Sequence, residues 1–164
     1  MTPNTVILAL VTLQRLGELW LSNRNTSRLL SRGAREYGAR HYPLIVAVHV
    51  LWLVALWWLA PPRPIDLGWL ALFAMLEIGR VWVMLSLGKR WTTRIIVLPE
   101  APLVRRGPYR FLNHPNYVVV VGEIAVLPLV FGLYWISLLF SALNAAALAI
   151  RIRAENRALR SLRA

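Results

Sequence analysis

The sequence predicts an all-α integral membrane protein with about five transmembrane helices, and three observations support this prediction. Hydrophobic residues make up 58% of the 164 positions, and Trp alone occurs eight times, yet the formal net charge is +12. A soluble core of this size cannot bury so much apolar side chain. The apolar residues gather in five runs, each close to the roughly 20 residues that a bilayer-crossing helix needs. The positive charge is concentrated in alternate segments between these runs.

The expected helices follow the apolar runs, at residues 3–21, 43–60, 67–88, 115–132 and 134–150. The last two form a helical hairpin with a tight connection, and the final helix is expected to continue into the basic segment after it. Residues 94–98, Arg-Ile-Ile-Val-Leu, indicate a short extended piece before a proline-containing turn. We expect one domain, residues 1–164, in which a three-helix membrane part (1–88) precedes a loop, the hairpin and a C-terminal segment (89–164).

Positive charge predicts the orientation of these helices. Residues 22–42 carry five arginines against one glutamate, residues 89–114 carry six basic residues against one glutamate, and residues 151–164 carry five arginines against one glutamate. The connections at 61–66 and 132–134 have no net charge. Because basic loops stay in the cytoplasm, all three basic segments are expected on the cytoplasmic face. With this hydropathy, their partner is expected to be anionic lipid headgroups and not nucleic acid.

Two pairs of opposite charges interrupt the apolar runs. Arg15 and Glu18 are three residues apart, and so are Glu77 and Arg80, so that each pair can meet on one helix face. One interpretation is that each pair neutralises itself and fixes helix packing. The other is that the pairs face a cavity or a functional site, as charges inside a membrane usually do. The spacing favours neither interpretation over the other.

Glu123 and His49 are the remaining titratable side chains within apolar runs. Glu123 has no partner on its own helix, so it is expected either to be protonated or to reach a basic group such as Arg80 or Arg151 on a neighbouring helix. His49 is more often a hydrogen-bonded interior histidine than a base or a ligand, by about three to one.

Residues 105–117, Arg-Arg-Gly-Pro-Tyr-Arg-Phe-Leu-Asn-His-Pro-Asn-Tyr, bring basic, aromatic and titratable side chains together between two apolar runs. Gly107 and Pro108 mark a turn. Pro115 suits the first position of a helix, where its missing N–H costs little. The start of that helix would direct free N–H groups and a partial positive charge at the loop, which suits a carboxylate or another anion.

Several kinds of active site are not indicated by the composition. Cysteine is absent, which excludes disulfides, thiolate ligands and Cys nucleophiles. The three histidines, His41, His49 and His114, lack metal-site spacing, and neither a GxSxG elbow nor a Gly-rich phosphate loop is present. Arg151 and Glu155 remain, four residues apart on one helix face. They could hold a substrate together, although on spacing alone the favoured interpretation is that the arginines of this segment anchor the last helix to headgroups.

Three motifs in the last third of the chain closely resemble the C-terminal signature of the isoprenylcysteine carboxyl methyltransferase family. They are Gly107-Pro108-Tyr109-Arg110, Asn113-His114-Pro115-Asn116-Tyr117 and, after the helical hairpin, Arg151-Ile152-Arg153-Ala154-Glu155. The family comprises integral membrane enzymes that use S-adenosylmethionine. The chain differs from the family pattern at Asn113, where Arg is common, and at Asn156, where a second acid is common. These differences argue against a prenylcysteine carboxylate as the acceptor.

The N-terminal half is similar to one bacterial branch of small methyltransferases, which accompany type III polyketide synthases and methylate alkylpyrone or alkylresorcinol hydroxyls. The residues that carry this similarity are Gln14-Arg15 with Glu18, Arg24-Asn25, Arg32-Gly33-Ala34 with Glu36, and His41-Tyr42-Pro43 with His49. The resemblance implies a location in the bacterial inner membrane. It also implies a lipophilic small-molecule acceptor and S-adenosylmethionine as the cofactor.

The resemblance implies a cytoplasmic cofactor site made of Gly107, Tyr109, Arg110, Asn113, His114, Pro115, Tyr117 and Glu155. Arg151 and Glu155 are the implied catalytic residues, with Arg151 orienting the acceptor oxygen, and no metal is expected. The expected acceptor-binding residues are Arg15, Glu18, His49 and Glu123. An acidic enol or a carboxylate is already ionised near neutral pH, whereas a less acidic phenol needs a general base. His49, Glu18 and Glu123 are all open for that role.

Three other functions stay open at the level of the sequence. The first keeps the fold and methylates a carboxylate on a prenylated or otherwise lipid-modified molecule. The second is a non-enzymatic, transporter-like bundle with a polar pathway through the two charge pairs. The third, more distant, is a membrane reductase on the same scaffold. The sequence does not indicate an oligomeric state.

Overall fold

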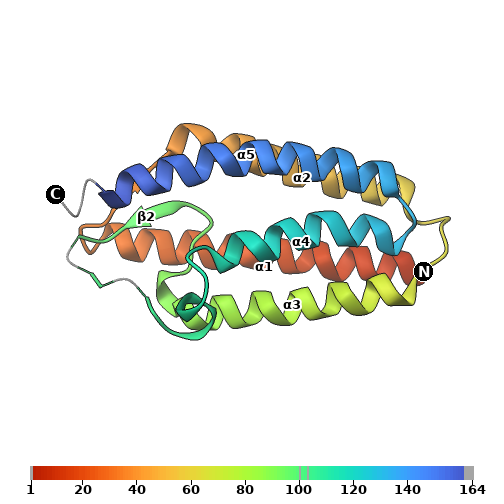
Figure 1. Ribbon diagram of the computed structural model, residues 1–164, viewed down its shortest axis with the longest axis horizontal. Helices are drawn as coiled ribbons and strands as arrows, with labels where there is room; N and C mark the ends of the chain where they lie inside the picture. Colours follow the sequence, from red (N-terminus) through yellow and green to blue (C-terminus); the bar gives the residue numbers. More distant parts are fainter. Residues whose placement is uncertain (1, 100, 103, 161–164) are drawn as a thin grey trace.

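The computed structural model describes residues 2–99, 101–102 and 104–160, with side chains through residue 155. Five helices lie side by side in an elongated bundle (Figure 1). They are α1 (Pro3–Leu30), α2 (Tyr42–Leu59), α3 (Leu67–Leu87), α4 (Pro115–Val130) and α5 (Tyr134–Arg160). The shorter elements are β1 (Arg35–Tyr37), η1 (Ala39–His41), η2 (Gly88–Arg90), β2 (Ile95–Val97) and η3 (Gly107–Arg110).

The helical class predicted from hydropathy is confirmed. Helices α1, α2, α3 and α5 are long and apolar enough to cross a membrane, and α4 is a shorter apolar helix of 16 residues. In Figure 1, α4 begins part-way along the bundle, whereas α5 beside it runs the whole length. The segment between α3 and α4 occupies the bundle end that α4 leaves open. A short fourth helix therefore makes room for a folded loop.

Helix α1 is longer than the predicted span of residues 3–21, because hydropathy marks the membrane boundary and not the end of the helix. The helix continues to Leu30 through a polar stretch. In that stretch, the Ser22 Oγ accepts a hydrogen bond from the Thr93 N–H (2.8 Å), and the Asn25 Nδ2 donates to the Trp91 carbonyl (2.8 Å). These contacts fix the start of the α3–α4 connection against the last turns of α1.

The described parts of all three basic segments lie at one end of the bundle (Figure 1). There β1 pairs antiparallel with β2, and Glu36 lies opposite Ile96 in the register. The extended piece predicted at residues 94–98 is therefore confirmed, but its partner strand was not predicted. The N-terminus and the two uncharged connections lie at the other end. The basic segments and the uncharged connections therefore lie at opposite ends of the bundle, as their charges predict.

The centre of the bundle depends on a close approach between α3 and α4. A Cβ atom at Gly122 would lie 2.7 Å from the Leu76 side chain, closer than side chains pack. The lack of a side chain at Gly122 lets the next residue, Glu123, reach α3 in the interior. Around this contact, apolar side chains including Trp52, Leu56 and Leu127 are completely buried.

Candidate active site

A cavity of about 920 Å³ lies at the basic end of the bundle. Its walls come from the end of α3, η2, β2, the loop before α4, the first turn of α4 and the end of α5. The predicted site residues that line it are Tyr109, Arg110, Asn113, His114, Tyr117, Arg151 and Glu155. Tertiary structure thus brings the motif at Asn113–Tyr117 together with the motif at Arg151–Glu155, although the two are about 40 residues apart in the sequence.

Gly107 shapes the loop that precedes this cavity. Its φ angle is +58°, and a Cβ atom there would lie 2.0 Å from the Ser86 Oγ on α3. Only glycine meets both the backbone and the steric requirement. The Arg106 Nε also donates to the Ser86 carbonyl (2.7 Å), so the loop is attached to α3 at this point. Gly107 therefore positions the cavity wall without lining it. Pro115, the first residue of α4, does not line the cavity either.

Tyr117 connects the two motifs through its hydroxyl group. The hydroxyl donates to the Glu155 Oε2 and accepts a hydrogen bond from the Arg151 Nε at 2.9 Å. The Arg151 guanidinium carbon also lies 5.6 Å from the centre of the Tyr117 ring. Arg151 and Glu155 are thus held on one face of α5, as their spacing predicts, by a residue in the first turn of α4.

His114 and Tyr109 complete this polar wall. The His114 ring stacks on Tyr117 with centres 5.2 Å apart, and its Nδ1 lies 3.8 Å from the Glu155 Oε2. No side chain caps α4 at His114, so the start of the helix is free to face a ligand. Burial, followed by the negative charge of Glu155, raises the pKa of Tyr109 to about 12. Its hydroxyl therefore stays protonated and able to donate at physiological pH.

Three polar atoms of cavity-lining residues are buried without a hydrogen-bond partner among the described residues. They are the Asn116 Oδ1, the Trp91 Nε1 and the Arg94 Nε. A buried donor or acceptor without a partner is costly, so such atoms usually indicate a bound water or ligand. Asn116 is part of the His-Pro motif, but its place in the wall could not be read from the sequence. The places of Trp91 and Arg94 depend on β2 and were also missed.

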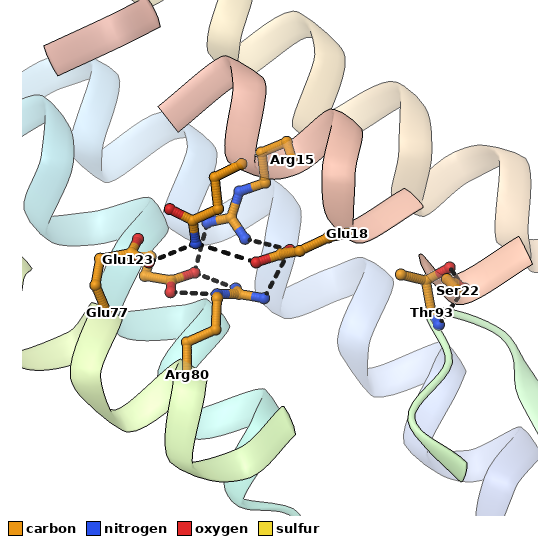
Figure 2. Close-up of polar contacts among 8 residues, drawn as sticks. Arg15, Glu18, Ser22, Glu77, Arg80, Thr93 and Glu123 are labelled. Atoms are coloured by element: carbon orange, nitrogen blue, oxygen red, sulfur yellow. Dashed lines mark hydrogen bonds and ion pairs between the residues drawn. The ribbon is translucent and has the colours of Figure 1, made fainter. Parts of the chain in front are cut away.

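The predicted acceptor-binding residues lie elsewhere. Arg15, Glu18 and Glu123 meet in the middle of the bundle with Arg80 and Glu77 (Figure 2). The Arg80 Nε donates to the Glu123 Oε1 (2.5 Å), its Nη2 pairs with the other oxygen of the same carboxylate, and its Nη1 lies 3.1 Å from the Glu18 Oε2. Arg15 joins the same two acids, at 3.0 Å from Glu18 and 2.7 Å from Glu123.

The pairing expected along each helix is therefore only half correct. Arg15 does pair with Glu18, but Arg80 pairs with acids of α1 and α4, while Glu77 accepts a hydrogen bond from the Gln14 Nε2 (2.5 Å). The expectation that Glu123 reaches Arg80 is confirmed. Arg80 pairs with Glu123 and not with Glu77, because the bidentate arginine–carboxylate pair between α3 and α4 has better geometry than an i,i+3 contact along α3.

His49 takes the ordinary role considered for it. Its Nδ1 lies 2.8 Å from the Ile45 carbonyl one turn earlier on α2, and the residue does not line the cavity. None of Arg15, Glu18, His49 and Glu123 is among the residues that line the cavity. Their predicted role in acceptor binding stays a prediction, and it has no support from the cavity's position.

Together, the fold and the cavity define a helical membrane protein with a polar, arginine-rich cavity at the basic end of its bundle. The sequence model of the isoprenylcysteine carboxyl methyltransferase (ICMT) family matches residues 69–161, which include every cavity motif on α4 and α5. The chain belongs to this family. It is therefore an integral membrane protein of a methyltransferase family, and methyltransferases of this family use S-adenosylmethionine.

Two bacterial relatives resemble the chain over nearly its full length. "Uncharacterized protein YpbQ" of Bacillus subtilis (strain 168) is 36% identical over 167 residues, covering 94% of this chain and 95% of the relative. An "Uncharacterized protein" of Haemophilus influenzae is 27% identical over 154 residues, covering 90% of both chains. No solved structure matches the chain. The N-terminal helices are thus shared with relatives beyond the stretch that the family model covers.

Proposed function

We propose that this protein binds S-adenosylmethionine in the cavity and transfers its methyl group to an anionic oxygen of a lipidic acceptor. The observation that carries the proposal is the connected wall of His114, Tyr117, Arg151 and Glu155 inside a cavity of about 920 Å³. That volume lies in the range of roughly 300–1,000 Å³ typical of small-molecule sites. The wall combines a carboxylate, guanidinium groups and aromatic rings, which are the groups that a charged nucleoside ligand needs.

The chemistry of the cavity fits the cofactor group by group. Glu155 can accept hydrogen bonds from an ammonium group or ribose hydroxyls, and the arginines and the start of α4 suit a carboxylate. The unpartnered atoms of Trp91 and Asn116 would gain partners from the ligand. When bound, S-adenosylmethionine supplies an electrophilic methyl group.

The contribution of the chain is alignment. Methyl transfer is a displacement in which the acceptor oxygen must lie in line with the bond that breaks, so holding the reactants together can supply much of the rate enhancement. Arg151 is fixed by Tyr117 at the cavity wall. Its guanidinium group can orient an acceptor oxygen by hydrogen bonding while Glu155 holds the cofactor.

The acceptor that this site favours is already ionised. His49, Glu18 and Glu123, the side chains considered as general bases, do not line the cavity. A carboxylate, or the acidic enol of an alkylpyrone, needs no strong base, whereas an alkylresorcinol phenol does. The family's description names a carboxyl methyltransferase, which favours a carboxylate on a prenylated or other lipid-modified molecule. The alkylpyrone enol is the second candidate because of the N-terminal resemblance.

The proposed setting is the bacterial inner membrane, with the cavity facing the cytoplasm and anionic headgroups around its rim. The basic segments at the cavity end support this orientation. A transporter-like path through Arg15, Glu18, Arg80 and Glu123 has less support, because these side chains bond to one another inside the bundle. A lipid acceptor would reach the cavity from the membrane, so that only its polar head needs to enter.

Calorimetric titration with S-adenosylhomocysteine, using the full-length protein in detergent, tests the cofactor. We expect saturable binding by the wild type, and at least tenfold weaker binding by Glu155→Gln, which keeps the shape of the side chain but removes its charge. Arg63→Gln is the control, since Arg63 is exposed in the connection between α2 and α3, and that connection lies at the opposite end of the bundle. Absence of binding by the folded wild type would overturn the proposal.

The acceptor class has its own test. Membranes containing the protein are incubated with methyl-labelled S-adenosylmethionine and a lipid extract, and the labelled lipid is treated with mild alkali. A methyl ester releases labelled methanol, whereas an aryl or enol ether retains its label. Release of labelled methanol is the expected result, because we favour a carboxylate acceptor. Retention of the label in the lipid would instead favour the alkylpyrone enol.

A further inference from the structure

A small side pocket of about 10 Å³ lies between the paired strands β1 and β2, η1, the start of α2 and α5. Arg94 and Arg151 line both this pocket and the large cavity, so the two spaces adjoin at these side chains. Glu36 and His41 are also in its wall. A volume of this size holds about one water-sized atom. The pocket therefore suits a single oxygen of a larger ligand that lies in the cavity.

Arg94 is held rigidly at the mouth of this pocket. Its Nη1 donates to the Glu36 Oε1 (2.9 Å), and its guanidinium carbon lies 4.6 Å from the centre of the Tyr42 ring. The Nε, in contrast, is buried without a hydrogen-bond partner. A guanidinium group has five N–H donors in a fixed plane. Arg94 thus offers a fixed cation with a donor left over for a ligand.

Arg151 lines the same pocket and is held in a similar way. It too is fixed by a tyrosine, Tyr117, through one hydrogen bond and its ring. The His41 Nδ1 in the same wall is buried without a partner. Two guanidinium groups therefore line one small space, and an anionic oxygen there would supply the partner that the buried Arg94 Nε lacks.

We infer that Arg94 and Arg151 form a clamp for a carboxylate or another anionic oxygen, with Glu36 as the residue that positions Arg94. The inference deepens the proposed function and rests on it. Such an oxygen has two sources in that reaction, the methionine carboxylate of the cofactor and the acidic group of the acceptor. Glu36 and His41 lie outside the stretch that the family model matches. The N-terminal half of the chain therefore supplies part of the ligand site and does more than span the membrane.

Two adenosine ligands separate the sources. S-adenosylhomocysteine carries the amino acid carboxylate, whereas 5′-deoxy-5′-methylthioadenosine lacks it. If the clamp holds the cofactor, Arg94→Gln weakens binding of the first ligand at least tenfold and leaves binding of the second unchanged. If the clamp holds the acceptor, both adenosine ligands bind as in the wild type, and Arg94→Gln instead weakens binding of dodecanoate, but not of uncharged dodecanol, at least tenfold.

Two further variants complete the calorimetric experiment on the full-length protein. Glu36→Gln should weaken binding of the same ligand as Arg94→Gln but by a smaller factor, because it removes the ion pair that positions Arg94 and keeps Arg94 itself. Arg28→Gln is the matched control. It removes an exposed arginine from the last turn of α1 and should change no affinity. The clamp is overturned if Arg94→Gln alters none of the ligands or weakens charged and uncharged ligands equally. If the wild type binds neither adenosine ligand but binds dodecanoate, and Arg94→Gln weakens that binding, the result would support the clamp while overturning the proposed cofactor.

Discussion

Two groups of charged residues in this protein contain the same kinds of side chain but differ in how deeply they are buried. In the bundle centre, Arg15, Glu18, Arg80 and Glu123 form ion pairs whose side chains are 1–13% exposed. At the cavity, the His114 and Glu155 side chains are 28% and 26% exposed, and they line an open space instead of the bundle interior.

The difference indicates what each group can do. A buried charge network whose cations each meet carboxylates from other helices has little capacity left for a ligand, and losing one member leaves an uncompensated charge. A partly exposed wall that faces a cavity can bind a ligand at small cost to the fold. We therefore expect substitutions in the central cluster to reduce stability and substitutions in the cavity wall to reduce ligand affinity.

The largest expected effect comes from Glu123→Ala. Arg80 would lose both hydrogen bonds to that carboxylate and Arg15 would lose one, inside a membrane-spanning bundle. Breaking a buried pair in this way costs about 3–5 kcal/mol. Thermal unfolding in detergent should show a large decrease in midpoint, with a smaller decrease for Glu123→Gln, which keeps an acceptor. An unchanged midpoint for Glu123→Ala would contradict the structural role of the cluster.

An intermediate effect is expected for Gly107→Ala, at the junction between bundle and cavity. The left-handed backbone alone costs about 1–2 kcal/mol for a residue with a Cβ atom, and the clash with the Ser86 Oγ adds to it. Both the unfolding midpoint and the affinity for S-adenosylhomocysteine should fall. Adding Ser86→Ala should recover only part of the loss, because the Ser86 Cβ and the Trp82 Nε1 would still lie 3.0 Å and 3.1 Å from the new methyl group. Ser86→Ala alone is the control. Full recovery by the double variant would mean that the backbone conformation is not strained.

The smallest effect on stability is expected for Tyr117→Phe. This substitution removes the hydroxyl between Arg151 and Glu155 but keeps the ring that stacks on His114. A hydrogen bond to a charged group contributes roughly 1.5–3 kcal/mol, so binding of S-adenosylhomocysteine should weaken tenfold or more. The unfolding midpoint should stay close to that of the wild type. A decrease as large as that of Glu123→Ala would show that the wall is part of the scaffold.

Hydropathy and local motifs were enough to predict much of the fold. The five helices, the tight hairpin, the extended piece near Ile96 and the continuation of the last helix all follow from apolar runs and turn residues. The grouping of Tyr117 with Glu155 followed only from family resemblance, because 38 residues separate them and no local rule links them.

The sequence by itself determined that the chain is a helical membrane protein, which segments are basic, and which motifs belong to the ICMT family, because these properties depend on composition and short-range order. Only the tertiary structure decided that Arg80 pairs with Glu123 and not with Glu77, and that Arg94 joins Arg151 at one pocket. Side chains that are distant in sequence meet according to how closely the backbones approach, as at Gly122, and that distance depends on the packing of all five helices together.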